Sequence, residues 1–276
     1  MKLQGRTAIV TGGAMGIGLA TARRLIHEQC AVTLWDMNES ALQESATALR
    51  AGGGVVFAHA CDVTDKARVT ALAQVAVQEM GRVDILINNA GYVQGGDFLQ
   101  LSDAEWHRTF DVNLNALRYT ISAFLPGMYT RNEGHIVNIS SAAGLIGVPG
   151  LAAYAASKWA VYGLTESLRL EAYANGKTGV RWSSIHPSYL AHGMFEGARL
   201  GTLGNMIVPL VKSHDVIARA IVESALKKGR HSPKRPLTLH LTPRLRAFMP
   251  DFLFQRFLIL LGVAGSMTEW KGRGHA

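Results

Sequence analysis

Residues 6–29 read RTAIVTGGAMGIGLATARRLIHEQ, and this stretch decides the fold. A short β-branched run leads into glycines at positions 12, 13, 16 and 18, and an amphipathic helical pattern follows them. A strand, a tight turn and a helix N-terminus in this order form a phosphate cradle, because glycines let the backbone approach an anion while the free N–H groups of the helix face it. The stretch therefore predicts a nucleotide-binding strand–turn–helix unit.

An acidic residue ends the second apolar run, Ala31–Asp36, 18 positions after Gly18. A carboxylate at this place binds a ribose diol in dinucleotide-binding folds. The alternative is that Asp36 is an ordinary N-cap of the next helix. Asp36 would repel a 2′-phosphate, and neither Met15 nor Met37 offers a compensating cation, so the sequence favours NAD over NADP.

Strand and helix patterns alternate along the rest of the chain with no linker between them. The expected strands cover 54–63, 83–91, 134–141, 179–187 and 237–241, and the expected helices cover 64–80, 102–125, 154–173 and 215–228. This alternation predicts an α/β fold, a single-domain Rossmann-type doubly wound parallel sheet, over residues 1–242. Asp62 and Asn89 follow apolar runs at the carboxyl ends of strands, where ligands of such sheets bind.

Tyr154 and Lys158 stand four positions apart in a helical pattern, so both side chains are expected on one face of one helix. A cation within a few ångströms favours a phenolate and lowers the phenol pKa from its ordinary value of about 10. Tyr154 is therefore a candidate proton donor and acceptor near neutral pH. The alternative is a half-buried aromatic beside a solvated lysine. Upstream, a β-rich run ends in Ser140 and Ser141, and one of these hydroxyls is expected to bind a substrate oxygen beside the phenol.

Two further features concern the surroundings of these residues. Asn113 and Asn115 lie in the middle of a helix that should otherwise be packed, and a buried amide needs hydrogen-bond partners, which indicates a structural or water-relay role. After Pro187 comes a long loop, about 188–212, that is rich in Gly, Met, Leu and Phe. Loops of this length in compact domains are usually lids or binding loops, so we expect an apolar substrate.

Composition narrows the function class. Hydrophobic residues make up 48% and charged residues 17% of the chain, as in a globular protein. The net charge of +8 comes entirely from residues 227–276. Residues 1–226 have no net charge, which argues against nucleic-acid binding by that part of the chain. The ten histidines form no HExxH or comparable cluster, so we expect no metal site. The N-terminus has no signal-peptide pattern, and Cys30 and Cys61 show no pairing pattern, so a cytoplasmic location is expected.

Residues 243–276 form a C-terminal extension with its own pattern. The apolar block Phe252–Val263 is interrupted by Gln255, Arg256 and Gly262 and is too short to cross a membrane. Three roles remain open for the extension. In the first, residues 244–263 form a peripheral amphipathic helix on a membrane surface. In the second they pack across a subunit interface, and in the third they cap the substrate pocket.

The motifs together resemble the short-chain dehydrogenase/reductase family over about residues 3–242. The matching residues are Thr11-GGAMGIG, Asp36, Asp62, Asn88-NAG, Asn113, Ser141 and Tyr154-AASK. The resemblance implies that Tyr154 is the catalytic acid/base, that Lys158 lowers its pKa and holds the nicotinamide ribose, that Ser141 orients the substrate carbonyl, and that Asn113 anchors a water. Ser141 is preferred to Ser140 because the family serine lies thirteen residues before its tyrosine.

The resemblance also implies a set of cofactor contacts, with Asp62 at the adenine and 89–91 beside the adenosine ribose. The residues are Gly12, Met15, Gly16, Ile17, Gly18, Asp36, Asp62, Val63, Asn89, Ala90, Gly91, Tyr154, Lys158, Pro187 and Leu190. One departure follows Pro187, where Ser188 replaces the usual glycine and His192 stands where a threonine is expected. We expect His192 to bind the carboxamide or line the lid, with a role as an extra acid as the alternative.

The function implied is an NAD-dependent short-chain alcohol dehydrogenase or ketoreductase for hydrophobic secondary alcohols and ketones, whether steroid-like, retinoid-like or bulky aryl and alkyl. A homodimer or homotetramer is implied as well. The alternatives are a membrane-associated NAD(P)-dependent reductase of lipophilic carbonyls and a non-catalytic dinucleotide-binding module, which would commonly lack the tyrosine or the lysine. Two further enzyme classes are disfavoured. An acyl-thioester reductase should prefer NADP, which Asp36 opposes, and an epimerase usually has a separate substrate domain, for which this chain has no room.

Overall fold

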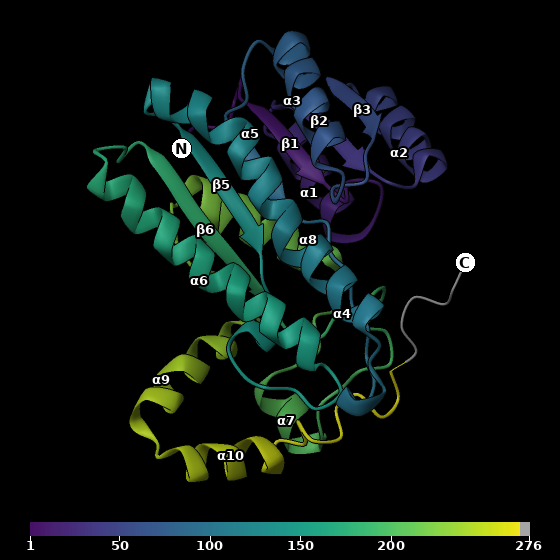
Figure 1. Ribbon diagram of the computed structural model, residues 1–276, viewed down its shortest axis with the longest axis vertical. Helices are drawn as coiled ribbons and strands as arrows, with labels where there is room; N and C mark the ends of the chain where they lie inside the picture. The colour runs from purple at the N-terminus through teal and green to yellow at the C-terminus, as the bar shows by residue number, and fades with distance from the viewer. Residues whose placement is uncertain (271–276) are drawn as a thin grey trace.

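A seven-stranded parallel sheet forms the centre of the protein (Figure 1), as the computed structural model, which describes residues 1–270, shows. The strand order is β3-β2-β1-β4-β5-β6-β7. The strands are β1 Thr7–Thr11, β2 Ala31–Asp36, β3 Val56–Ala60, β4 Ile85–Asn88, β5 Gly134–Ile139, β6 Val180–Pro187 and β7 Lys234–Arg235. The order reverses between β1 and β4, so the predicted doubly wound fold is confirmed, and ligands of such sheets bind at this switch point.

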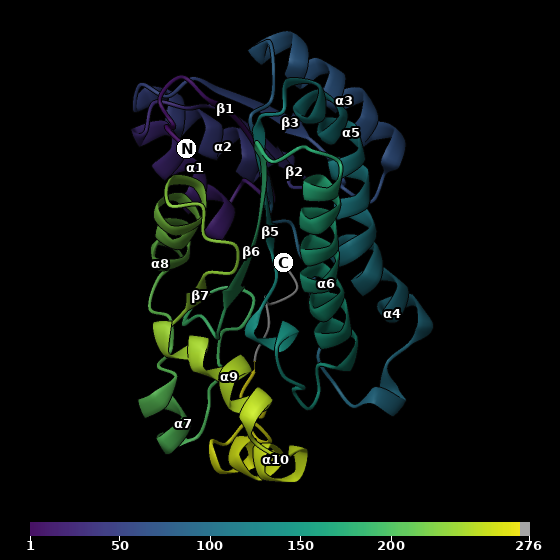
Figure 2. The same ribbon diagram turned by 90° about the vertical axis from the view of Figure 1, so that its left-hand side faces the viewer.

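Helices cover both faces of the sheet (Figure 2). One face carries α1 Gly16–His27, α2 Glu39–Ala51 and α8 His214–Arg219, which runs on as the π-helix η4 Ala220–Lys227. The other face carries α3 Lys66–Met80, α4 Asp103–Phe110, α5 Ala116–Arg131 and α6 Ala152–Ala174. Two short 3-10 helices, η1 Phe98–Gln100 and η3 Ala142–Gly144, follow β4 and β5.

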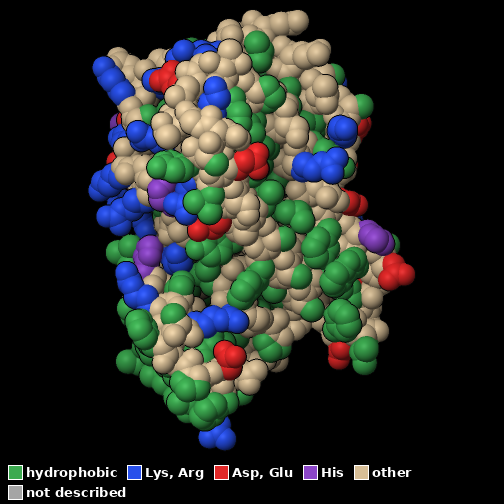
Figure 3. Space-filling model, turned by 60° about the vertical axis from the view of Figure 1, so that its left-hand side comes forward, with side chains coloured by type: hydrophobic (Ala, Val, Ile, Leu, Met, Phe, Trp, Pro, Cys, Tyr) green, Lys and Arg blue, Asp and Glu red, His purple; other side chains and the backbone are tan. Residues whose placement is uncertain are grey.

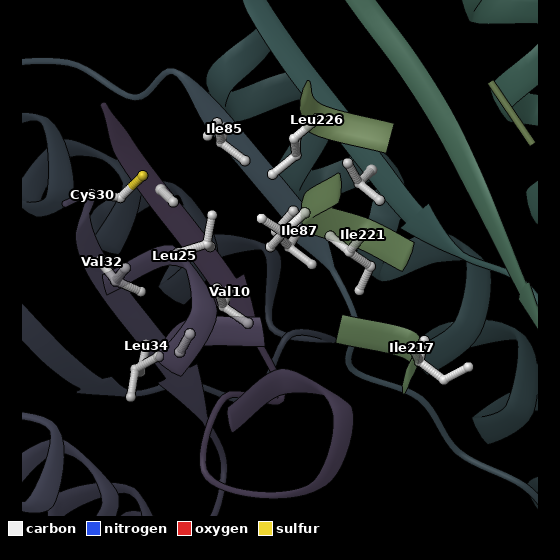
Figure 4. Close-up of a cluster of buried hydrophobic side chains, with 14 of the residues drawn as sticks. Val10, Leu25, Cys30, Val32, Leu34, Ile85, Ile87, Ile217, Ile221 and Leu226 are labelled. Carbon is white, nitrogen blue, oxygen red and sulfur yellow. The ribbon is translucent and has the colours of Figure 1, made fainter. Parts of the chain in front are cut away.

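Two apolar cores lie on either side of the sheet because its central strands are apolar on both faces. In the first, side chains of β1, β2 and β4 meet α1 and the 214–227 helical stretch, with Leu25, Ile87 and Ile221 among them (Figure 4). In the second, α3, α5 and α6 pack around the fully buried Trp35 and Trp182. The sheet is thus held rigidly beneath the residues at its carboxyl edge.

A π-helical turn, η2 Asp111–Asn115, joins α4 to α5 in one continuous helix. The helix starts with a capping box, in which Ser102 and Glu105 exchange side-chain and backbone hydrogen bonds. The wider turn places Asn113, which is fully buried, against the site side of α6. Single π-turns inside α-helices are frequent at functional sites.

The end of the chain departs from one expectation. The strand expected at 237–241 is wrong, because Leu237–His240 forms a 3-10 helix, η5, and the last strand ends at Arg235. Pro236 has no N–H with which to continue the hydrogen-bond ladder. Beyond it follow α9 Leu241–Phe248 and α10 Asp251–Leu260, which lie with α7 Thr202–Ile207 at one end of the molecule (Figures 1 and 2). Within residues 1–270 no helix is both long and apolar enough to cross a membrane.

Candidate active site

The glycine turn after β1 has no room for a side chain at Gly12 or Gly18. An ideal Cβ on Gly18 would clash with the Gly12 carbonyl oxygen, and Gly12 and Gly16 have φ of +62° and +59°. The Asn89 amide donates to the Thr11 and Gly12 carbonyl oxygens at 2.9 and 3.0 Å, which ties the turn to the end of β4. The turn therefore offers a bare backbone at the N-terminus of α1, and a dinucleotide pyrophosphate fits such a cradle.

The close approach of Gly18 to Gly12 can be tested by adding a methyl group at Gly18. Gly18→Ala should lower the free energy of unfolding by about 1–3 kcal/mol, as overpacking does, and should weaken NAD binding by at least about tenfold because the turn must shift. Calorimetric titration of NAD and chemical denaturation measure both quantities. The matched control is Gly163→Ala, also in a helix but with nothing within 4 Å of its ideal Cβ, which should stabilise the fold by up to ~1 kcal/mol. Unchanged NAD affinity in Gly18→Ala would contradict the cradle.

Asp36 points its carboxylate back at this turn. It accepts hydrogen bonds from the backbone N–H groups of Ala14 and Asn38, both at 3.0 Å. Asn38, and not Asp36, caps α2 by accepting from Ala41 N. The N-cap alternative for Asp36 is therefore wrong, and the carboxylate lies at the carboxyl end of β2 beside the cradle. Met37, the next residue in the chain, and Met15, in the glycine turn, are both exposed.

Asp62 and Val63 follow β3 at the same edge of the sheet. One oxygen of Asp62 accepts hydrogen bonds from Thr64, from its backbone N–H at 2.9 Å and its hydroxyl at 2.8 Å. The carboxylate is thereby oriented, while the Val63 side chain is buried in the second core. The geometry is compatible with the predicted adenine contacts, which stay a prediction.

Tyr154 and Lys158 lie together in the first turns of α6, as their spacing predicts. Both are buried, with the Lys158 Nζ 5.6 Å from the centroid of the Tyr154 ring. The ammonium donates to the Ile139 carbonyl oxygen at 2.9 Å, at the carboxyl end of β5. An ideal Cβ on Gly91 would lie 3.7 Å from Nζ, an ordinary van der Waals distance, so Gly91 borders the ammonium. The glycine turn, Gly91 and the two side chains thus share one edge of the sheet.

Burial dominates the protonation of this pair. It raises the pKa of the Tyr154 phenol above its ordinary value, and the hydrogen bond with Ser141 opposes that rise only in part. Burial also lowers the pKa of the Lys158 ammonium to about 8. The prediction that Lys158 lowers the pKa of Tyr154 is therefore wrong for the protein alone. The ammonium is turned to the Ile139 carbonyl, and the loss of hydration outweighs its attraction for the phenolate.

The two candidate serines have different partners. Ser140 donates its hydroxyl to the Lys158 carbonyl oxygen at 2.8 Å and so anchors α6 to the sheet. Ser141 accepts from Ala143 N at 3.2 Å and lines a cavity beside Tyr154. A buried imidazole, His186, stands 3.1 Å from the Ser141 carbonyl oxygen through Nδ1 and holds that backbone in place. Of the two hydroxyls, that of Ser141 is the one placed to meet a substrate.

The Asn113 side chain makes three hydrogen bonds within the protein. Its oxygen accepts from Tyr92 N at 2.8 Å, and its NH₂ donates to Tyr92 O at 2.9 Å and to Ser157 Oγ at 3.0 Å. These bonds fasten the segment after β4 to α6, one residue before Lys158. Asn113 therefore acts on the site by positioning its neighbours, and its anchoring of a water stays a prediction. Asn115, by contrast, donates to Asp111 within the same helical stretch.

An apolar cavity opens directly from Ser141 and Tyr154. The segment after β5 supplies Ile146, Val148 and Leu151 to its wall. It encloses about 70 Å³, less than the roughly 150 Å³ cavity that holds benzene in an engineered protein. The cavity as it stands is thus smaller than one that holds a benzene ring.

The predicted substrate loop and the C-terminal extension form the remaining walls. From the loop come Tyr189, Phe195 and Leu200, with the Phe195 ring edge-on to Tyr154 at 5.3 Å between centroids. From the extension come Leu245 on α9, the α10 side chains of Phe254, Phe257 and Leu258, and Leu261 directly after α10. The pocket-capping role, one of three left open by the sequence, thus matches the position of the inner face of the extension.

The last described residues contact the predicted substrate loop. Ser266 shares a 2.8 Å hydrogen bond with the Tyr189 hydroxyl, and the Trp270 indole N–H donates to the Met194 carbonyl oxygen at 3.0 Å. Trp270 packs against Gly95, where an added Cβ would lie 2.6 Å from its ring. Sequence patterns did not single out these contacts, because they join segments far apart in the chain.

The predicted site residues after β6 lie in different surroundings. Ser188 lines the cavity, whereas His192 is exposed and takes no part in the cavity wall. Pro187 ends β6, and Leu190 is buried in a bridge to Val211. The sequence missed His214 at the start of α8, whose ring lies 3.7 Å from an ideal Cβ on Gly16. No motif or residue spacing in the sequence indicates a role for His214.

Comparison with protein families and known proteins agrees with this geometry. A family model described as short chain dehydrogenase matches residues 6–201. Epidermal retinol dehydrogenase 2 from Homo sapiens is 35% identical over 250 residues, covering 90% of this chain and 80% of that protein. Estradiol 17-beta-dehydrogenase 11 from Mus musculus is 36% identical over 195 residues, covering 71% of this chain and 65% of that protein.

Two solved structures have the same architecture. A short chain dehydrogenase/reductase from Burkholderia phymatum in complex with NAD has a TM-score of 0.79 and 29% identity, covering 92% of this chain and 96% of that one. A metagenomic short-chain oxidoreductase in complex with NADP has a TM-score of 0.68 and 33% identity, covering 82% of this chain and 92% of that one.

Proposed function

This chain belongs to the short-chain dehydrogenase/reductase family of NAD(P)-dependent oxidoreductases, and from that premise we propose that it transfers hydride between NAD and a lipophilic secondary alcohol or ketone. The observation that carries the proposal is the apolar cavity that reaches Tyr154 and Ser141 at one end and is closed by the C-terminal extension at the other. Both side chains border it, so the hydroxyl of a secondary alcohol bound there meets the proton-transfer group directly.

The proposed mechanism uses four side chains. When bound, NAD accepts hydride at its nicotinamide ring or, in its reduced form, donates it. Tyr154 takes the hydroxyl proton of an alcohol or gives a proton to a ketone oxygen, and Ser141 holds that oxygen by hydrogen bonding. Lys158, fixed to the Ile139 carbonyl, presents a positive charge beside the phenol. Asn113 keeps the segment that contains Gly91 in register with α6 through Tyr92 and Ser157.

The preference for NAD over NADP rests on Asp36. Its carboxylate stands at the end of β2 and is oriented by two backbone N–H groups, where it suits a ribose diol and repels a 2′-phosphate. Related structures hold either cofactor, so the relatives alone do not choose between them. The absence of a basic side chain at Met15 and Met37 supports the same preference.

The lipophilic substrate class rests on the lining of the cavity. Aromatic and aliphatic side chains make up most of its walls, and Ser141 and Tyr154 supply hydroxyl groups at one end. Such a site fixes one oxygen by hydrogen bonds and binds the remainder by burial of apolar surface. The names of two relatives, a retinol dehydrogenase and an estradiol dehydrogenase, are consistent with this class.

A chain-length series of secondary alcohols tests the substrate class. With NAD, kcat/KM should rise along 2-butanol, 2-octanol and 2-dodecanol, by up to about fourfold for each methylene that becomes buried. Leu258→Gln, inside the cavity, should flatten the rise, and Leu253→Gln, exposed on the same helix, should leave it unchanged. A preference for short or charged alcohols would overturn the proposed class.

A further inference from the structure

The outer face of the extension is apolar although it faces solvent. In α7, α9 and α10 the exposed large apolar side chains are Leu203, Met206, Leu241, Phe248, Phe252, Leu253, Ile259 and Leu260. We call these residues the apolar end face. Phe248 is 87% exposed and Met206 77% exposed. In Figure 3 hydrophobic side chains gather at the lower end of the molecule, the end at which Figure 2 places these helices. Contiguous apolar surface of this kind marks an interaction site.

Helix α10 is apolar on both sides. Its inner side chains, including Phe254 and Leu258, line the cavity, while Phe252, Ile259 and Leu260 point outward. A helix that covers the core of a domain in water usually has a polar outer face. Its outward apolar residues therefore need an apolar partner of their own.

The charges on α9 and α10 are mainly positive. Exposed Arg244, Arg246 and Arg256 stand against one acidic residue, Asp251. The Arg246 guanidinium lies 4.9 Å from the Trp159 ring centroid and donates to the Leu145 carbonyl oxygen, so it also fixes α9 to the catalytic domain. Apolar side chains interspersed with arginines fit an apolar layer bordered by negative charge.

We propose that the apolar end face docks on the surface of a lipid bilayer that contains anionic headgroups, with its phenylalanines and leucines in the acyl boundary and its arginines at the headgroups. A second copy of the chain fits this face less well. A twofold interface would place the same patch opposite itself and so bring the two sets of arginines together. The lipid surface complements both the apolar residues and the charge.

The position of the face also connects it with the cavity. α10 separates the two, with Phe257 and Leu258 inside and Ile259 and Leu260 outside. Docking would bring this wall of the narrow cavity against the phase in which lipophilic alcohols dissolve. The docking itself does not depend on the proposed substrate, because it rests on the outer residues alone.

Vesicle co-sedimentation of the full chain tests the proposal. The protein should sediment with phosphatidylcholine vesicles that contain phosphatidylserine, and much less with pure phosphatidylcholine. Phe248→Ser/Phe252→Ser/Ile259→Ser should weaken binding on the order of 100-fold. The matched control, Val55→Ser/Val77→Ser/Leu170→Ser, removes exposed apolar side chains elsewhere and should bind as the unaltered chain does.

A second pair of variants tests the charge. Arg244→Gln/Arg256→Gln should weaken binding to the anionic vesicles by roughly 30-fold, at about 1 kcal/mol for each arginine, and hardly change binding to neutral ones. NAD titration of every variant checks that it is folded. The proposal is overturned if the unaltered chain does not sediment with anionic vesicles. It is overturned equally if the Phe248 triple variant keeps its vesicle binding, or if that variant converts a dimer into a monomer while the unaltered dimer ignores lipid.

Discussion

Replacing Tyr154 with phenylalanine is expected to lower kcat for alcohol oxidation by at least about 100-fold, the lower end of what a positioned acid/base contributes. The phenol is the buried hydroxyl that borders the cavity beside Ser141, so its removal leaves the alcohol proton without an acceptor. NAD affinity should stay nearly intact, because the glycine turn and Asp36 are untouched. Steady-state kinetics and calorimetric titration of NAD measure the two effects.

A second phenol in the same cavity supplies the control. The Tyr189 hydroxyl bonds to Ser266 and lines the cavity, so Tyr189→Phe should change kcat by less than about tenfold. Oxidation by the unaltered enzyme should also rise with pH, because the phenolate is the base and burial holds the phenol pKa above its ordinary value. Turnover equal to that of the unaltered enzyme in Tyr154→Phe, or its loss in Tyr189→Phe alone, would remove Tyr154 from the mechanism.

Replacing Asp36 with alanine is expected to reduce the preference for NAD over NADP by about 100-fold in kcat/KM. A hydrogen bond to a charged group contributes about 1.5–3 kcal/mol, which the NAD ribose would lose, and the repulsion of a 2′-phosphate would disappear as well. Initial rates with each cofactor at one saturating alcohol concentration give the ratio.

Asp62 is the matched acidic control for that experiment. It lies at the end of the neighbouring strand, β3, and the family resemblance places it at the adenine, which both cofactors share. Asp62→Ala should therefore weaken NAD and NADP alike and leave their ratio unchanged. An unchanged ratio in Asp36→Ala, or a changed one in Asp62→Ala, would refute the assignment of Asp36.

Local sequence patterns predicted most of the sheet and the catalytic edge. Apolar runs of strand length, separated by helical periods, were enough for six of the seven strands, because parallel strands are buried on both faces. The spacing of Tyr154 and Lys158 was enough to place both on one side of α6, since helical periodicity is a local property. The last strand was predicted at the wrong residues. Leu237–His240 has the alternating pattern of a strand, but Pro236 before it ends the hydrogen-bond ladder.

Local sequence patterns could not predict the features that depend on contacts between distant segments. The pKa of Tyr154 follows from burial and from the turning of Lys158 to Ile139, neither of which a four-residue spacing contains. The cavity is built from the segment after β5, the substrate loop and α10, which meet only in the folded chain. For the extension, composition left three roles open. The structure places the inner side chains of α10 in the cavity wall, and the membrane role of its outer side is our proposal.

The most direct measurement follows deuterium from the carbinol carbon of 2-dodecanol into the cofactor by mass spectrometry. The account predicts that the unaltered enzyme transfers one deuterium to the nicotinamide of NAD for each ketone formed, and that Tyr154→Phe does so at about a hundredth of the rate or less. NAD binding without deuterium transfer from any lipophilic secondary alcohol, or equal transfer by the two proteins, would contradict it.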